Sequence, residues 1–334
     1  MNKKRLVFSV ILSLLLVFVV VSCWDDDDVV VIYLNDPADN VEPGDIHTND
    51  SINDSNDNND SIIHGDTIVL PGFDQDGASL ALFSISPSRQ VRFSRGNLQY
   101  QPSTGLWRFA EHQYDYIGLD NENISANYNG WIDLFGWGTS GWNSGAIAYQ
   151  PWSTSTSCSD YYPGGDWTNN LAGDYIKADW GRYNKISNGG NQANKWRALK
   201  SYEWKYLLIM RDDAEEKYGL ASIDGIHGRV ILPDNWAMPS GVPFFVPGCD
   251  GWYNNSYDFA QWEIMEESGA IFLPAAGMRE GINVSQTESC GAYWSTIHND
   301  ENSACIMIFL RDDMRADRWY AKRYAGLSVS LVTW

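Results

Sequence analysis

The residues of this chain divide into three stretches, and only the last has a composition that can fold into a compact domain. Residues 6–21 are almost entirely apolar, and residues 24–76 contain 15 Asp and Glu but no Lys or Arg. Fifteen of the 16 tryptophans lie in the 258 residues of 77–334. Each buried ring removes a large apolar area from water, so this stretch can form one large domain despite many loops.

The apolar stretch has the features of an export signal. Basic residues occupy positions 3–5, and the 16 residues of 6–21 are fewer than the about 20 that cross a bilayer. The stretch ends in Val20-Val21-Ser22-Cys23, which resembles the lipobox of bacterial lipoproteins. That resemblance implies cleavage before Cys23 and a diacylglycerol on its sulfur, so residues 1–22 are expected to be a lipoprotein signal peptide. An uncleaved membrane anchor is the alternative.

Residues 23–76 are expected to be an acidic, disordered tether. The segment 35–66 is rich in Asp, Asn, Ser, Pro and Gly and has almost no aromatic residue to offset the entropy of ordering. The run Trp24-Asp25-Asp26-Asp27-Asp28 directly after Cys23 resembles the surface-export signal of Bacteroidetes lipoproteins. The expected location is therefore the outer membrane, on the cell surface, through a lipid anchor.

The negative charge belongs mostly to this tether. The formal charge of −20 becomes −23 without the three basic residues of the leader, and the 15 acidic residues of 24–76 leave −8 on the domain. Contacts with phosphate dominate nucleic-acid binding, and the domain has few basic clusters to make them. Nucleic acid is therefore not an expected partner.

Within 77–334 we expect an α+β domain of short antiparallel strands, two helices and long loops. Strands are expected at 80–85, 90–94, 98–100 and 107–109 as an antiparallel meander, and at 270–274, 291–295, 303–310 and 327–332. One helix is expected over 195–210, with Ser201 as an internal start signal, and another over 259–267, with Trp262 and Met265 inward. The segment 130–167, with tryptophans among Gly, Ser and Thr, is expected to be an ordered loop region that carries binding function.

The helix at Leu199-Lys200-Ser201-Tyr202-Glu203-Trp204-Lys205-Tyr206 resembles the Leu-Thr-x-x-Glu-Trp-x-Tyr helix of the formylglycine-generating-enzyme-like (sulfatase-modifying-factor) superfamily. The runs at 291–296, 304–309 and 326–332 are similar to the closing strands of the same group, especially those of the Fibrobacter-type major paralogous domain. The resemblance covers about residues 80–334. It implies a C-type-lectin-like fold.

The reactive residues of that superfamily do not map onto this sequence. Its enzymes bind copper through a closely spaced Cys pair, whereas Cys290 and Cys305 are 15 residues apart, and Ser330 replaces the usual Arg before the last Leu-Val. The calcium motif of C-type lectins is incomplete too, since Gln150-Pro151-Trp152 and Trp142-Asn143-Ser144 each lack a ligand. No catalytic residue, metal or cofactor is therefore expected.

Four cysteines remain beyond Cys23, namely Cys158, Cys249, Cys290 and Cys305. An oxidising exterior permits disulfides, and four cysteines allow three pairings. Buried thiols and a single disulfide both stay open, and Cys290 with Cys305 is the first pair to test.

The candidate binding residues are loop aromatics, namely Trp142, Trp152, Tyr161 and Tyr162. Such rings can stack on a sugar face or fill a pocket of a protein partner, and packing into the core is the alternative for each. The sequence thus favours a surface-anchored, non-catalytic lipoprotein that recognises a glycan or protein ligand. A structural subunit of a surface assembly and an oxidase of the formylglycine-generating type are the alternatives.

Overall fold

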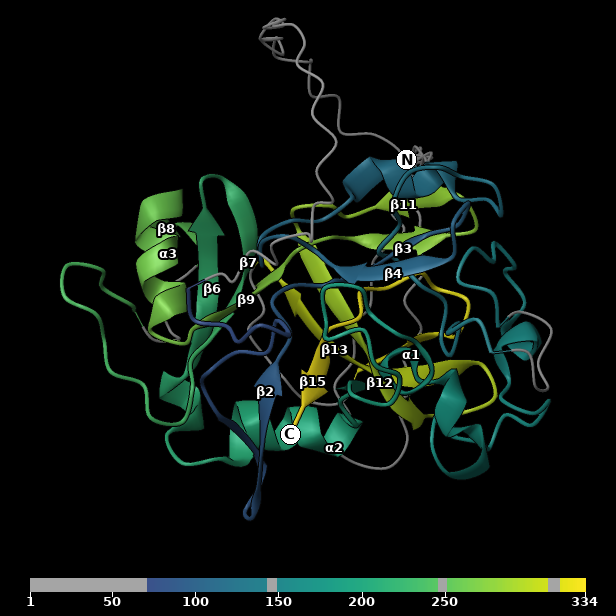
Figure 1. Ribbon diagram of the computed structural model, residues 1–334, viewed down its shortest axis with the longest axis horizontal. Helices are drawn as coiled ribbons and strands as arrows, with labels where there is room; N and C mark the ends of the chain where they lie inside the picture. The colour runs from purple at the N-terminus through teal and green to yellow at the C-terminus, as the bar shows by residue number, and fades with distance from the viewer. Residues whose placement is uncertain (1–70, 143–148, 246–250, 312–318) are drawn as a thin grey trace, which may run out of the picture.

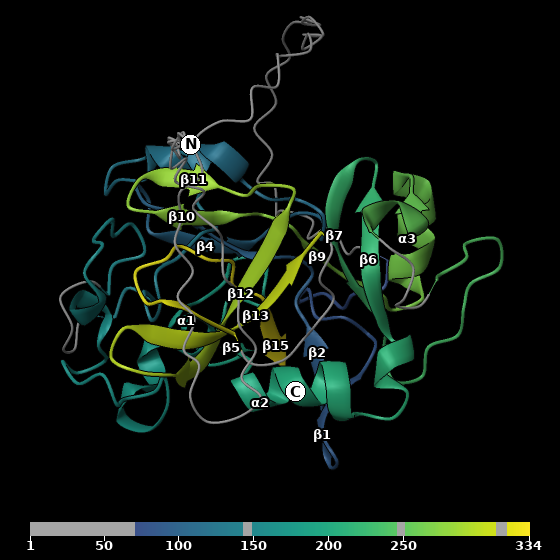
Figure 2. The same ribbon diagram turned by 180° about the vertical axis from the view of Figure 1, so that it is seen from behind.

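The computed structural model describes residues 71–142, 149–245, 251–311 and 319–334 (Figures 1 and 2). Cys23, the expected signal peptide, nearly all of the expected tether and Cys249 lie outside the described residues. In the described ranges, none of the helices has the length and apolar character needed to cross a membrane. The architecture is α+β, with many short strands in open sheets and few helices.

The strands are β1 (Phe83–Ser86), β2 (Arg89–Phe93), β3 (Leu98–Gln101), β4 (Leu106–Phe109), β5 (Arg197–Ala198), β6 (Tyr218–Ile223), β7 (Ile226–Ile231), β8 (Ser256–Tyr257), β9 (Ile271–Pro274), β10 (Met278–Glu280), β11 (Asn283–Ser285), β12 (Cys290–His298), β13 (Ser303–Leu310), β14 (Trp319–Lys322) and β15 (Leu331–Thr333). The α-helices are α1 (Trp180–Tyr183), α2 (Ser201–Lys205) and α3 (Phe259–Glu267), and a π-helical turn over Tyr206–Met210 continues α2. Short 3-10 turns cover Gly118–Asn123, Cys158–Tyr161, Gly173–Ala178, Ala214–Glu216 and Trp252–Asn254.

The C-terminal strand joins the N-terminal hairpin to the middle of the chain. Strand β15 lies between β2 and β5, with Val332 opposite Phe93 on one side and Arg197 on the other (Figure 2). The expected meander over 80–109 is therefore wrong beyond its first hairpin, because β15 occupies the edge of β2 and leaves β3 and β4 as a separate pair. The other sheets have the orders β8-β6-β7-β9, β12-β13-β14 and β10-β11.

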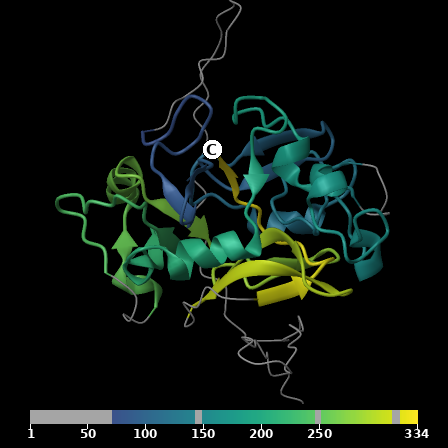
Figure 3. The ribbon, with the colours of Figure 1, turned by 90° about the horizontal axis from the view of Figure 1, so that it is seen from below.

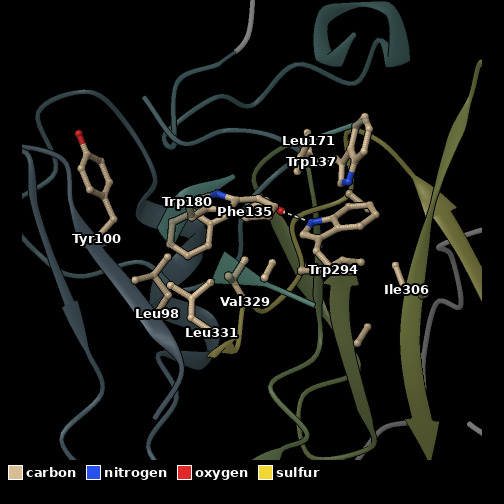
Figure 4. Packing of buried hydrophobic residues seen from close by; sticks show 14 of the residues in the cluster. Leu98, Tyr100, Phe135, Trp137, Leu171, Trp180, Trp294, Ile306, Val329 and Leu331 are labelled. Atoms are coloured by element: carbon tan, nitrogen blue, oxygen red, sulfur yellow. Dashed lines mark hydrogen bonds between the residues drawn. The ribbon is translucent and has the colours of Figure 1, made fainter. Parts of the chain in front are cut away.

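The sheet of β12, β13 and β14 separates two parts of the hydrophobic core. Along β13, Ala304 and Ile306 face one cluster and Met307 and Phe309 face the other, as the alternation of side chains in a strand requires. In the first cluster the Nε1 atom of Trp294 donates to the carbonyl oxygen of Phe135 at 2.6 Å (Figure 4). This ring therefore buries its apolar body and still satisfies its N–H group. A third cluster lies between α3 and the sheet of β6, β7 and β9 (Figure 2).

Helix α3 has the bounds that the sequence predicts, and both Trp262 and Met265 point into the core. The side chain of Asp258 accepts a hydrogen bond from the backbone N–H of Gln261 at 2.7 Å, and the side chain of Gln261 accepts one from the backbone N–H of Asp258 at 3.0 Å. This reciprocal cap satisfies two of the N–H groups that a helix start leaves unpaired.

The helix expected over 195–210 begins later than predicted, at Ser201. Arg197 and Ala198 form a strand instead, and the guanidinium of Arg197 binds both carboxylate oxygens of Glu203, at 2.6 and 3.0 Å. Glu203 also accepts a hydrogen bond from the backbone N–H of Lys200 at 2.9 Å. The Glu-Trp pair of the sequence pattern therefore has a structural role, because Glu203 caps the helix and Trp204 packs into the second cluster. Figure 3 shows this helix running beside the C-terminal strands.

Candidate functional site

The four aromatic residues predicted to bind a ligand lie in different environments. Tyr161 is buried, with 2% of its surface exposed, and its hydroxyl bonds with Ser153 Oγ at 3.0 Å and donates to the carbonyl oxygen of Ser155 at 2.8 Å. The prediction for Tyr161 is wrong, because a ring that closes the core cannot stack on a ligand. Trp142 and Trp152 are half-buried and pack against the first core cluster, as in the core-packing alternative.

Tyr162 contacts the same arginine, Arg323, that binds the backbone of Trp167. Trp167 and His298 are aromatic side chains that the sequence did not single out as binding residues. Trp167 exposes 39% of its surface, and its ring meets His298 edge-on with a centroid distance of 5.8 Å. Tyr162 and His298 are half-buried. We call Tyr162, Trp167 and His298 the loop cluster. The first two come from the long loop region, and His298 ends β12, so residues far apart in sequence form one surface.

A buried arginine holds the loop cluster together. Arg323 follows β14 and has no exposed surface, and its Nη2 atom donates to the carbonyl oxygens of Trp167 at 2.7 Å and Asp300 at 2.6 Å. Its guanidinium carbon lies 4.6 Å from the ring centroid of Trp137 and 5.1 Å from that of Tyr162. Burial lowers its pKa to about 10, so the side chain stays charged at neutral pH. One cation thus binds two loops and two rings.

His298 is held in one orientation and one tautomer. The Oδ1 atom of Asn170 accepts hydrogen bonds from the backbone N–H of His298 at 2.8 Å and from its ring Nδ1 at 2.8 Å. Because that oxygen accepts the backbone N–H, Nδ1 carries the ring proton and Nε2 is left as an acceptor. Burial, assisted by the positive charge of Arg323, lowers the pKa of His298. The ring is therefore neutral at pH 7.

Carboxylates surround the loop cluster. The Oδ1 atom of Asp166 accepts hydrogen bonds from the backbone N–H of Thr168 at 2.9 Å and its hydroxyl at 2.8 Å, and these bonds lower the pKa of Asp166. The Oδ1 atom of Asp300 accepts from the backbone N–H of Ser303 at 2.7 Å. Both side chains are thereby fixed by their own turns, and Glu301 beside them is exposed.

Of the two arrangements left open for the cysteines, the structure has thiols: Cys158, Cys290 and Cys305 form no disulfide among the described residues, so the candidate disulfide between Cys290 and Cys305 is absent. In the β12–β13 ladder Cys290 lies opposite Leu310, five positions along β13 from Cys305, which is about 16 Å at the rise of a strand. A disulfide needs Cα atoms within about 7 Å. Cys290 is buried, which raises the pKa of its thiol to about 12, and the thiol of Cys305 donates to the carbonyl oxygen of His298 at 3.6 Å.

Within the parts of the chain that the structure describes, no three His, Cys, Asp or Glu side chains gather closely enough to hold a metal ion. Comparison with known proteins gives no match, whether to family models, to curated proteins or to solved structures. The geometry of the loop cluster is therefore the basis for a functional conclusion.

Proposed function

We propose that this protein is a surface lipoprotein, anchored through Cys23, whose C-type-lectin-like domain binds a glycan at the loop cluster. The observation that carries the proposal is the exposed ring of Trp167 on a backbone fixed to buried Arg323. An aromatic side chain that is already ordered loses little entropy when a ligand covers it. The anchor and the fold are supported by the lipobox-like ending and by the Glu203-Trp204 helix.

The chemistry of the loop cluster suits the two faces of a sugar. The C–H groups of a pyranose ring form an apolar face that can stack on Trp167, while its hydroxyl groups need hydrogen-bond partners. His298, whose ring meets Trp167 edge-on, supplies Nε2 as an acceptor, and Asp166, the residue before Trp167, supplies a carboxylate. A few placed polar groups beside an aromatic surface are typical of small-molecule sites, and the function proposed for this site is binding without catalysis.

The test is a glycan array probed with the full acylated chain in detergent. We expect binding to a subset of host or plant glycans by the wild-type protein, and loss of that binding in Trp167→Ala. Tyr253→Ala is the matched control, because Tyr253 is also an exposed aromatic residue but lies against His227, away from the loop cluster. An array without hits, or hits that survive Trp167→Ala, would contradict the proposal.

The lipid anchor has its own test. Mass spectrometry of the N-terminal peptide should find Cys23 as the first residue with a diacylglycerol on its sulfur. Protease added to whole cells should remove the domain. An unmodified Cys23, or a domain that resists protease until the cells are lysed, would contradict surface display.

A second candidate function, a subunit of a surface assembly, is favoured by the outer face of the 201–210 helix. Tyr202, Ile209 and Met210 are exposed there, at a spacing that places them on one side of the helix. If this face binds a sister subunit, a pull-down of the protein from membrane extracts should recover a partner at fixed stoichiometry. The double variant Ile209→Lys, Met210→Lys should no longer recover that partner. Recovery of the same partner with the double variant would show that this face does not bind it.

A further inference from the structure

We infer that the loop cluster selects uncharged sugars and rejects those that carry a carboxylate or sulfate. The inference rests on the proposed glycan binding and names the class of sugar that this site takes. The selectivity depends on which charged side chains are accessible to a ligand that stacks on Trp167.

Five ionisable side chains act electrostatically on Tyr162 or His298; one is the thiol of Cys158, whose pKa is raised by burial, and three of the other four are carboxylates. Asp166, Asp300 and Glu301 supply the negative charge, and Arg323 supplies the positive charge. Asp166 and Glu301 are exposed, so their charges face solvent beside the side chains on which they act. The fixed hydrogen bonds of Asp166 also favour its charged form down to acidic pH.

The positive charge of Arg323 cannot compensate an anionic ligand by direct contact. The side chain has no exposed surface, and its Nη2 atom already donates to two carbonyl oxygens. The Nε and Nη1 atoms are buried, with no hydrogen-bond partner among the described residues, and the guanidinium is enclosed between the rings of Trp137 and Tyr162. The arginine therefore holds the residues of the loop cluster in place from the interior, and none of its N–H groups is accessible to the carboxylate of a sugar acid.

The histidine offers no positive charge either. Its lowered pKa leaves the ring neutral at pH 7, and its one ring proton is engaged by Asn170. The exposed Nε2 atom accepts a hydrogen bond from a sugar hydroxyl but repels a carboxylate oxygen. Acceptors facing the ligand thus match hydroxyl groups, and a carboxylate on the sugar meets the like charge of Asp166 and Glu301.

The experiment compares a neutral oligosaccharide found on the array with the same oligosaccharide in which one hexose is oxidised to the uronic acid. Binding to the full acylated chain in detergent is measured at about 20 mM and about 0.5 M salt, because salt screens interactions between exposed charges. At low salt we expect the acidic form to bind at least about tenfold more weakly, and high salt should narrow this difference.

Two variants test whether the exposed carboxylates beside the loop cluster cause the weaker binding of the acidic form. Glu301→Gln should strengthen binding of the acidic form at low salt and leave the neutral form unchanged, whereas Glu216→Gln, which removes an exposed carboxylate elsewhere, should change neither. The inference is overturned if the acidic form binds as tightly as the neutral form or more tightly. It is also overturned if Glu301→Gln leaves the difference in affinity between the two forms unchanged. In both cases the proposed glycan binding itself would stand. Failure of both sugars to bind overturns the proposed function with it.

Discussion

The Nη2 atom of Arg323 donates a hydrogen bond to the carbonyl oxygen of Trp167 at 2.7 Å, and this contact fixes an exposed aromatic loop to the interior. The same atom binds the carbonyl oxygen of Asp300, so two loops depend on one buried cation. An arginine suits this position because its planar guanidinium can donate along an edge while its faces contact aromatic rings.

Arg323→Lys should loosen the loop cluster. A lysine keeps the charge but cannot bind two carbonyls while lying flat between two rings, so the unfolding free energy should fall by about 2–4 kcal/mol. Amide hydrogen exchange over 162–170 should become at least about tenfold faster. Arg182→Lys is the control, since Arg182 makes a surface hydrogen bond to Asn194. Unchanged exchange over 162–170 would show that Arg323 does not hold the loop.

Asp179 should make the protein less stable as pH rises. Its carboxylate caps α1 by accepting from the backbone N–H of Gly181 and also accepts from the backbone N–H of Ala198 in β5, and burial raises its pKa from 3.8 to about 7. The folded protein therefore holds this proton more tightly than the unfolded chain, so this group lowers the unfolding free energy progressively between about pH 4 and about pH 7.

Asp179→Asn removes that titration. Urea unfolding at several pH values should show a smaller decline between about pH 4 and about pH 7 than in the wild type, by about 1.4 kcal/mol for each unit of the pKa shift. Asp224→Asn, at an exposed hairpin turn, should keep the decline of the wild type. An unchanged decline in Asp179→Asn would show that Asp179 is already charged in the folded protein at acidic pH.

Glu203→Gln should destabilise the fold strongly. The change leaves the buried guanidinium of Arg197 without a counter-charge, and breaking such a pair typically lowers stability by about 3–5 kcal/mol. Chemical denaturation measures this loss, and Glu215→Gln, at an exposed position, should stay close to the wild type. A loss below about 1 kcal/mol would indicate that the Arg197–Glu203 pair contributes little.

Thiol labelling tests the corrected cysteine arrangement. Cys290 is buried, and its pKa of about 12 keeps it protonated, so it should react with maleimide only after unfolding. Cys158 and Cys305, which are half-buried, should react in the native protein before Cys290 does. Recovery of a peptide that links Cys290 to Cys305 after non-reducing digestion would contradict the observed register.

The sequence predicted those elements that have a strong local pattern. Helix α3 was predicted with Trp262 and Met265 inward, and β13 from a continuous apolar run. The hairpin of β6 and β7 was missed although Asp224-Gly225 signals it, with φ angles of 47° and 89° that suit a tight hairpin turn. The pairing of β15 with β2 could not be predicted, because the two strands are more than 200 residues apart and no local signal joins them.

The candidate binding residues were predicted less well than the elements of secondary structure. Tyr161 and Tyr162 are neighbours in sequence, yet one is buried and the other borders the surface, because consecutive side chains leave the backbone in different directions. Trp167 shares its loop composition with Trp142 and Trp152, so composition alone cannot tell an exposed ring from a docked one. The sequence around Arg323 does not indicate that this arginine is buried. Its burial depends on the carbonyl oxygens and rings that it contacts, which come from distant parts of the chain.

Titration calorimetry with a glycan identified on the array tests the central claim most directly. The claim predicts that the wild-type protein and Tyr253→Ala bind this sugar with equal affinity, and that Trp167→Ala binds at least about tenfold more weakly with its fold intact. Equal affinity of Trp167→Ala and the wild type would contradict it.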